Sequence, residues 1–573
     1  MNLIQDYTVP RKLIHATLLS TALAMATPVG ADTNLGAYLA ARQAGISHDY
    51  APAADYFMTA LVADPSNTFL MENALASHLG LGNIEAARPL SQQMINAGAA
   101  SQIAHMVALA AAANDGLWDD ILANFEAGQT IGPLVDGLAQ AWAFVGEGDI
   151  GAALSAFDAV IEAPGLRAFG LYHKMLALAS VGDFEGADVI LSLPPGQGLQ
   201  RTRRVSLIHA SILSQLDRNA DAITMLDNTF GPQQDPDVAD LRAQLEAGGS
   251  QRFTAVINPT QGIGEVMFSV AGALQGESAD AYTLFYARLA AYLNPSNADA
   301  LILSAQLLEG LEQYDLASTT YRRVPRDDSA FYAAELGRSA VLRRDGRIDA
   351  AIEVLQQLAR SYPDQPFVTV TLGDALRSDG RHQDANAAYT DALAQYDDSH
   401  ADRWWAYYTR GITNERLGDW PAAEADLRAA LTLQPDNPNI LNYLGYSMVE
   451  KQVNLDEALS MIEKAANARP DSGAIVDSLG WVLYRLGRYE EAVEPMERAA
   501  ELEPVDPVIN DHLGDVFWAV GRDIEARFQW NRALSFDPES EEADRIRRKL
   551  EIGLDAVLIE EGAEPIRVAN DDG

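Results

Sequence analysis

The sequence contains no cysteine and few basic residues. Without cysteine, structural disulfides, thiolate zinc sites, catalytic thiols and lipid attachment to an N-terminal cysteine are excluded. Lys and Arg number 41 against 81 Asp and Glu, which gives a formal net charge of −40. Because nucleic-acid phosphates require a positive field, this balance argues against nucleic-acid partners. The acidity either keeps a long alanine-rich chain soluble or attracts a basic partner.

Catalytic motifs are missing as well. The sequence has no Walker-type phosphate loop, no HExxH, no GxSxG and no complete GxGxxG. Its nine histidines are scattered, so no set of metal ligands is expected. Acidic pairs such as Glu490-Glu491 stand at a helix start, where they favour the helix dipole. We therefore expect a non-enzymatic protein without catalytic residues, metal or cofactor.

The chain does contain a helical repeat of 34 residues. No stretch alternates β-branched and polar residues, so we expect an all-α protein. The period is clearest in two consecutive blocks, 473–506 and 507–540. Each block reads as two amphipathic helices separated at a glycine and ended by a proline. The positions that match between the blocks are Leu479/Leu513, Gly480/Gly514, Leu483/Phe517, Gly487/Gly521, Ala492/Ala526, Met496/Trp530, Ala499/Ala533 and Pro504/Pro538.

One such helix pair cannot bury its apolar face alone, so a stack of neighbours is required. The phase is lost between residues 236 and 262, where helix-breaking residues gather. That segment is either a joint between two arrays or a bulge in a continuous solenoid. Elsewhere the phase predicts about fourteen helix pairs. Their block starts lie near residues 34, 68, 102, 134, 168, 203, 262, 298, 332, 366, 404, 438, 473 and 507.

The N-terminus has the composition of an export signal. Arg11-Lys12 supplies a positive region, residues 13–26 are an apolar run, and residues 29–31 are small enough for cleavage. The apolar run is short for a transmembrane helix. We expect export to the periplasm, with an uncleaved amphipathic N-terminus as the alternative.

These patterns together divide the chain into six segments. Pro495, inside the second helix of block 473–506, predicts a kink or irregularity there without loss of the repeat. The predicted segments are a signal peptide at 1–31, a degenerate N-terminal array at 32–247, an irregular joint at 248–261, a C-terminal array at 262–540, a polar capping helix at 541–559 and a flexible tail at 560–573.

The Leu-Gly, Gly, Ala, aromatic, Ala and Pro positions of blocks 473–506 and 507–540 resemble the tetratricopeptide repeat (TPR). The resemblance implies an α-solenoid in which positions 2, 5, 9 and 12 of each first helix face a concave groove. Aromatic rings interleaved with Asn and Asp suit an extended peptide. The alternative is that Trp481 and Trp518 fill space between adjacent repeats. The partner-binding residues predicted by position are Trp405, Tyr408, Asn442, Tyr446, Asp477, Trp481, Tyr484, Asp511, Asp515 and Trp518.

The run 438–540 and the exported start also resemble the large envelope TPR proteins that act as adaptors for a carboxyl-terminal processing protease. Those adaptors are typically outer-membrane lipoproteins, whereas this chain has no cysteine to acylate, so membrane association is left open. The resemblance implies a scaffold or adaptor in the bacterial cell envelope, whose protein partners include an envelope protease. An alternative is a peptidoglycan or exopolysaccharide assembly or secretion factor. The sequence does not decide between a monomer and an oligomer.

Overall fold

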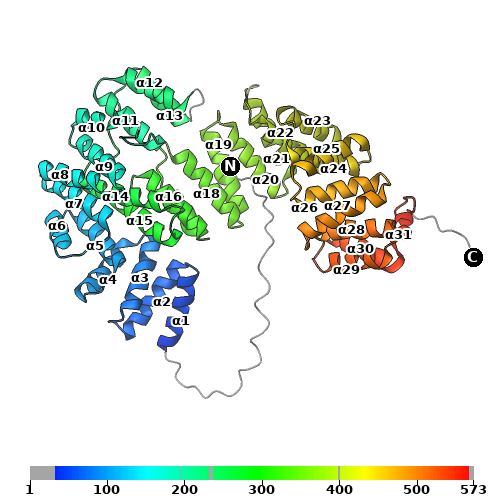
Figure 1. Ribbon diagram of the computed structural model, residues 1–573, viewed down its shortest axis with the longest axis horizontal. Helices are drawn as coiled ribbons and strands as arrows, with labels where there is room; N and C mark the ends of the chain where they lie inside the picture. Colours follow the sequence, from blue (N-terminus) through cyan, green and yellow to red (C-terminus); the bar gives the residue numbers. More distant parts are fainter. Residues whose placement is uncertain (1–32, 195, 232–235, 398–399, 567–573) are drawn as a thin grey trace, which may run out of the picture. The chain divides into compact units, whose positions relative to one another are not determined.

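The computed structural model describes residues 33–194, 196–231, 236–397 and 400–566. Within these ranges the chain forms thirty-one α-helices and no β-strand (Figure 1), which confirms the predicted all-α fold. The predicted signal peptide and the end of the predicted tail lie outside the described residues. In the described part, every helix is too short or too polar to cross a bilayer.

The helices form two compact units that divide between Arg347 and Ile348. We call them unit 1 and unit 2. The helices of unit 1 are α1 (Thr33–Ile46), α2 (Tyr50–Ala63), α3 (Thr68–Leu81), α4 (Ile84–Asn96), α5 (Gln102–Asp115), α6 (Trp118–Glu126), α7 (Pro133–Glu147), α8 (Ile150–Glu162), α9 (Arg167–Ser180), α10 (Phe184–Leu191), α11 (Arg203–Gln215), α12 (Asn219–Phe230), α13 (Pro236–Glu246), α14 (Pro259–Leu274), α15 (Asp280–Leu293), α16 (Ala298–Gly310), α17 (Tyr314–Tyr321) and α18 (Phe331–Arg344).

Unit 2 continues the alternation of first and second helices and ends with two further helices. Its helices are α19 (Ile348–Ser361), α20 (Pro366–Ser378), α21 (His382–Gln395), α22 (Arg403–Arg416), α23 (Trp420–Leu433), α24 (Pro438–Glu450), α25 (Leu455–Ala468), α26 (Gly473–Arg485), α27 (Tyr489–Leu502), α28 (Pro507–Ala519), α29 (Asp523–Leu534), α30 (Ser540–Ile552) and α31 (Leu554–Glu560).

The fourteen predicted block starts each fall within three residues of a helix start. The largest difference is at the block predicted from 262, whose helix α14 begins at Pro259. Glycines let the two helices of a pair approach closely. A Cβ built on Gly514 would lie 2.4 Å from the Trp530 ring of the paired helix, and one on Gly480 would lie 2.5 Å from Met496.

Two details of unit 2 concern predicted irregularities. The repeat around Pro495 is kept, because α27 is α-helical without interruption from Tyr489 to Leu502. The C-terminal cap was predicted as one helix, and this was wrong. Gly553 has a φ of 84° and separates α30 from α31, because that backbone conformation ends the helix.

In unit 1 the helices that follow the periodic array, α14 and α15, pack back against earlier repeats. The chain leaves helix after α13 and re-enters it at α14, close to the predicted joint at 248–261. The next two helices do not extend the stack from α12. Instead, α14 packs against α5, α7 and α9, and α15 packs against α3 and α5 (Figure 1). The contacts therefore place α14 and α15 within unit 1, and the compact units divide about a hundred residues after the lost phase.

Candidate functional site

The predicted binding residues lie on the first helices of unit 2, namely α22, α24, α26 and α28. We call the surface of these helices and of α20 the unit 2 face. At its α22 end the indole Nε1 of Trp405 donates to Oδ2 of Asp374, at 3.1 Å. The ring centroids of Trp405 and Tyr408 lie 5.7 Å apart, and those of Tyr408 and Tyr443 lie 6.1 Å apart. Adjacent repeats thus share a continuous row of half-buried aromatic rings.

Asn442 continues this row on α24. Its side-chain Oδ1 is buried and has no hydrogen-bond partner among the described residues. Tyr446 is half-buried one turn further along the same helix. Burial, followed by the charges of Glu450 and Asp477, raises the pKa of Tyr446, so its hydroxyl stays neutral at physiological pH. Asn442 therefore provides an acceptor without a partner, and Tyr446 provides an aromatic ring with a hydroxyl group.

The next repeat uses its predicted residues in internal contacts. The indole of Trp481 stacks on the rings of His512 and Tyr484, with centroids 3.9 and 4.8 Å away. Its Nε1 donates to Oε1 of Glu450 at 2.7 Å. Asp477 lies 3.0 Å from Nδ1 of His512, and all these side chains except Glu450 are buried. In this structure Trp481 fills space between adjacent repeats, which is the alternative raised from the sequence.

The last repeat is engaged by the C-terminal cap. Lys549 of α30 has no exposed surface, and its Nζ donates to both Asp511 and Asp515, at 2.8 and 2.7 Å. The indole of Trp518 donates to Asp555 of α31 at 2.9 Å. Three predicted binding residues are therefore bonded within the chain. The sequence reading missed Lys549, although it lies three residues after Ile546 on the buried stripe of α30, where a lysine requires a buried carboxylate.

Of the ten predicted residues, six are half-buried. Two of these, Asp511 and Trp518, are bonded to the cap. The other four form the accessible part of the unit 2 face, and they are Trp405, Tyr408, Asn442 and Tyr446.

In unit 1 the first helices α3, α5, α7 and α9 are packed against α14 or α15 instead. A Cβ on Gly262 of α14 would lie 2.2 Å from the Trp142 ring of α7, so only glycine permits this approach. The hydroxyl of Tyr172 on α9 donates to Oε1 of Glu265 at 2.7 Å. On α15, Arg288 Nε donates to the carbonyl of Gly80, at 3.0 Å. We call this surface the unit 1 face.

A buried ionic contact fixes α14 on the unit 1 face. Glu265 is 1% exposed, and Arg204 of α11 donates to it twice, through Nε to Oε1 at 3.0 Å and through Nη2 to Oε2 at 2.7 Å. Burial of the Arg204 guanidinium opposes its charge, but Glu265 and its neighbours hold the arginine pKa well above the usual value. The bidentate pair joins α14 to α11 within unit 1.

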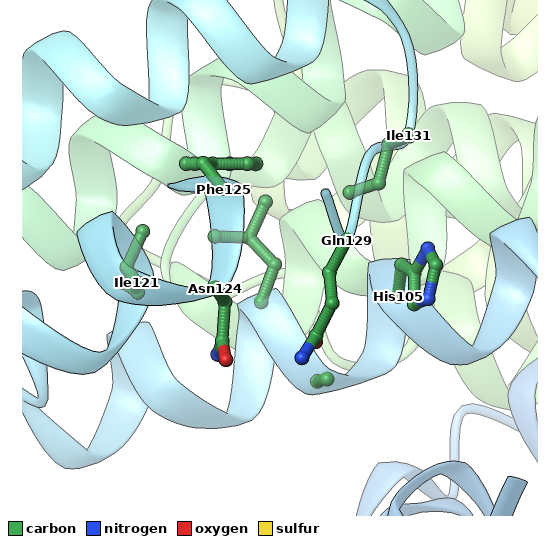
Figure 2. Close-up of a pocket in the computed structure, with 8 residues that line it drawn as sticks. His105, Ile121, Asn124, Phe125, Gln129 and Ile131 are labelled. Atoms are coloured by element: carbon green, nitrogen blue, oxygen red, sulfur yellow. The ribbon is translucent and has the colours of Figure 1, made fainter. Parts of the chain in front are cut away.

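A separate pocket lies between α5, α6 and the loop that follows α6 (Figure 2). His105 and Leu109 come from α5, and Ile121 and Asn124 from α6. Figure 2 shows the amide ends of Asn124 and Gln129 reaching in the same direction. In the described part of the chain, no group of three or more His, Asp or Glu side chains is arranged to hold a metal ion.

The repeat unit itself is decided by comparison with known families. A sequence model of the tetratricopeptide repeat family matches residues 302–366, 370–438, 408–452 and 450–507. These residues are tetratricopeptide repeats. The first helices α22, α24 and α26 of the unit 2 face lie within these repeats, as the sequence resemblance implied.

Similar proteins are found over parts of the chain. A TPR repeat-containing protein of Pseudomonas aeruginosa is 33% identical over 162 residues, which are 28% of this chain and 26% of that protein. Bacteriophage adsorption protein A of Escherichia coli is 36% identical over 81 residues, 14% of this chain and 8% of that protein. The chain thus matches about a quarter or less of the length of these curated relatives. A crystal structure of a tetratricopeptide repeat protein from Parabacteroides merdae, 15% identical, covers 45% of this chain and 98% of its own, with a TM-score of 0.37.

Proposed function

We propose that this protein is a non-enzymatic scaffold of the bacterial cell envelope that binds a partner protein on the unit 2 face. The observation that carries the proposal is Asn442. Its amide oxygen is buried without a partner in the described structure, while Tyr408 and Tyr446 lie half-buried on the same face. A buried unmet acceptor costs free energy, and turning the Asn442 side chain towards a partner's N–H group would remove that cost.

The contrast between the two TPR faces supports the choice of unit 2. At positions 5 and 9 the first helices α5 and α7 of unit 1 carry Met106, Ala110, Leu138 and Trp142, which are buried beneath α14 and α15. The corresponding positions of α22 and α24 carry Tyr408, Ile412, Asn442 and Tyr446. Permanent interfaces are the more apolar ones, whereas exchangeable interfaces mix aromatic and polar groups. Unit 1 therefore has the composition of a filled face and unit 2 that of an exchangeable one.

The partner in this proposal is an extended segment of protein. Half-buried rings grip apolar side chains, and a side-chain amide pairs with a peptide unit of the main chain. Acting as an adaptor would mean that an envelope protease is one partner, in line with the resemblance of residues 438–540. The export-like residues 1–31 support placement in the envelope.

The test is affinity capture from an envelope extract with the full chain and with Asn442→Ala and Tyr446→Ala. Proteins bound by the wild type are identified by mass spectrometry, purified, and titrated against each variant. We expect each substitution to weaken binding by about tenfold, the equivalent of about 1.4 kcal/mol.

The matched control is Gln356→Ala, which removes an amide from the second-helix side of unit 2, where it lines a different hollow. It should bind like the wild type. Partners recovered and bound equally by all variants would exclude the unit 2 face. Loss of an envelope glycan with retention of every protein would favour the role in peptidoglycan or exopolysaccharide assembly.

A further inference from the structure

Unit 1 contains a second hollow that its own helices do not fill. This hollow, of about 370 Å³ and open to solvent, is lined by α4, α5, α6 and the loop after α6. It shares Ala108, Asn124 and Gln129 with the pocket of Figure 2, so the two lie next to each other. We call the combined space the outer hollow. No residue of α14 or α15 lines it, which separates it from the unit 1 face.

The floor of the outer hollow is made of small side chains. Ala108 and Ala112 lie one turn apart on α5, both half-buried, with Ala111 between them. Small side chains let another chain approach the helix closely. The walls are set apart because α6 is short, ending at Glu126 after 9 residues, whereas α4 has 13. The hollow therefore follows from the length of one helix and the alanines of its neighbour.

Unpaired amides stand around this floor. Asn124 and Gln129 are half-buried, and neither side chain has a hydrogen-bond partner within the part of the chain that is described. Gln92 of α4 donates to Asn96 at 3.0 Å. Figure 2 shows the Asn124 and Gln129 amides reaching in the same direction, each with both a donor and an acceptor to offer. Two free amides on one lining can pair with the N–H and C=O groups of a peptide main chain.

The charges at the hollow favour a ligand without acidic groups. Arg88 and Asp115 form an ion pair with each other at its rim, so neither charge is left for a ligand. Asp120 is the remaining carboxylate of the lining. Phe125 is the aromatic residue among the lining residues, and it lies half-buried at the pocket end. A hollow with so little aromatic surface is poorly suited to stacking a sugar ring, which favours a peptide.

We infer that the outer hollow is a second protein-docking site, which takes an extended, uncharged peptide segment with small side chains over the alanine floor. The Asn124 and Gln129 amides bond its main chain, and the alanines select small residues by leaving room for them. This site lies on unit 1, apart from the unit 2 face of the proposed function.

The experiment uses the full chain and a displayed library of short peptides without charged residues. A selected peptide is titrated by fluorescence anisotropy against the wild type, Asn124→Ala, Gln129→Ala and Ala108→Leu. We expect each amide variant to weaken binding by about tenfold, and Ala108→Leu to abolish it by filling the floor. The control Ala359→Leu fills a hollow of unit 2 in the same way and should bind unchanged.

Three outcomes would overturn the inference. They are selection of no peptide above background, equal affinity for the wild type and Ala108→Leu, and displacement of the peptide by neutral N-acetylated sugar oligomers. Asn442→Ala is measured in parallel. Peptide binding that Asn442→Ala leaves intact shows that the outer hollow acts independently, so failure at one site is distinguishable from failure at the other.

Discussion

The Nζ of Lys549 lies 2.7 Å from Oδ1 of Asp515, and both side chains are almost fully buried. This contact joins the cap to the last repeat. Asp511 shares the same ammonium group, and Arg545 lies 3.7 Å from Asp515. Burial, opposed by Lys549, raises the pKa of Asp511 above its usual value. The cap is therefore joined to the last repeat by a buried charged group.

Replacing Lys549 with Met should destabilise the cap strongly. Two buried carboxylates would lose their shared cation, which corresponds to a loss of about 3–5 kcal/mol in the free energy of unfolding, measured in urea. The triple variant that adds Asp511→Asn and Asp515→Asn should recover most of the loss. Arg548→Met removes an exposed cation of the same helix and should leave the unfolding midpoint near that of the wild type. A Lys549→Met chain as stable as the wild type would contradict this account.

His512 should make unit 2 less stable as the pH rises. Burial lowers the pKa of this histidine, but the negative charges of Asp477, Asp511 and Asp515 raise it by more. The net result is that the pKa in the folded protein lies above 6.5. The stabilisation is present below pH 6.5 and is lost as the pH rises through the folded pKa, with a slope of up to about 1.4 kcal/mol per pH unit. Urea unfolding between pH 6 and 9 measures it. The slope should be absent in His512→Gln and reduced in Asp477→Asn.

His173 should give unit 1 the opposite dependence. Burial among α7, α9 and α14 lowers the pKa of His173 to about 3. The folded histidine stays neutral, so stability is full above pH 6.5 and falls as the pH decreases from there towards 3. Thermal unfolding of the wild type and His173→Gln across this range isolates the effect, because acidic groups titrate in both chains. Parallel curves for the two proteins would refute it.

Gly262→Ala should weaken the hold of α14 on unit 1. The added methyl group would meet the Trp142 ring, and overpacking of this kind costs about 1–3 kcal/mol. Gly272 lies on the same helix with nothing within 4 Å of a Cβ, so Gly272→Ala should stabilise the protein by about 0.5–1 kcal/mol. Opposite shifts in the urea midpoint are expected, and shifts of equal sign would contradict the assigned contact.

Tyr50→Phe should raise the free energy of unfolding by roughly 1 kcal/mol. The hydroxyl of Tyr50 is buried with no hydrogen-bond partner in the described residues, and burial raises its pKa to about 12. Tyr389→Phe is the counterpart, because that hydroxyl donates to Asp374 at 2.7 Å. Tyr389→Phe should lower the free energy of unfolding by about 1–3 kcal/mol. Urea denaturation of both variants and the wild type measures the two changes.

The repeat phase was predictable because helix pairs depend on local contacts. Gly480 and Gly514 each lie where the two helices of one 34-residue block approach closely, and the structure places Met496 and Trp530 against them. The break at Gly553 was also present in the sequence, as a glycine inside the predicted capping helix 541–559. The side-chain partners of the cap needed the fold, because Lys549 and Asp511 are 38 residues apart.

The candidate site was less predictable, for a related reason. Position within a repeat placed Tyr408, Asn442 and Tyr446 on one face, but it could not show that Asp515 and Trp518 are covered by later helices. Likewise, Gly262 and Gly264 read as breakers, whereas they lie inside α14, where Gly262 accommodates Trp142. Periodicity describes neighbours along the chain and carries no information on segments that return to an earlier repeat.

The return of α14 and α15 to the unit 1 face changes how this part of the chain must assemble. In an ordinary repeat array each pair can fold on its neighbour, so stability spreads along the chain step by step. Here Arg288 reaches Gly80 across 208 residues and Thr260 reaches Ala113 across 147. Such distant contacts slow folding and tie separate repeats into one cooperative block. During synthesis, the apolar face of the first repeats therefore stays uncovered until residue 293 has been made.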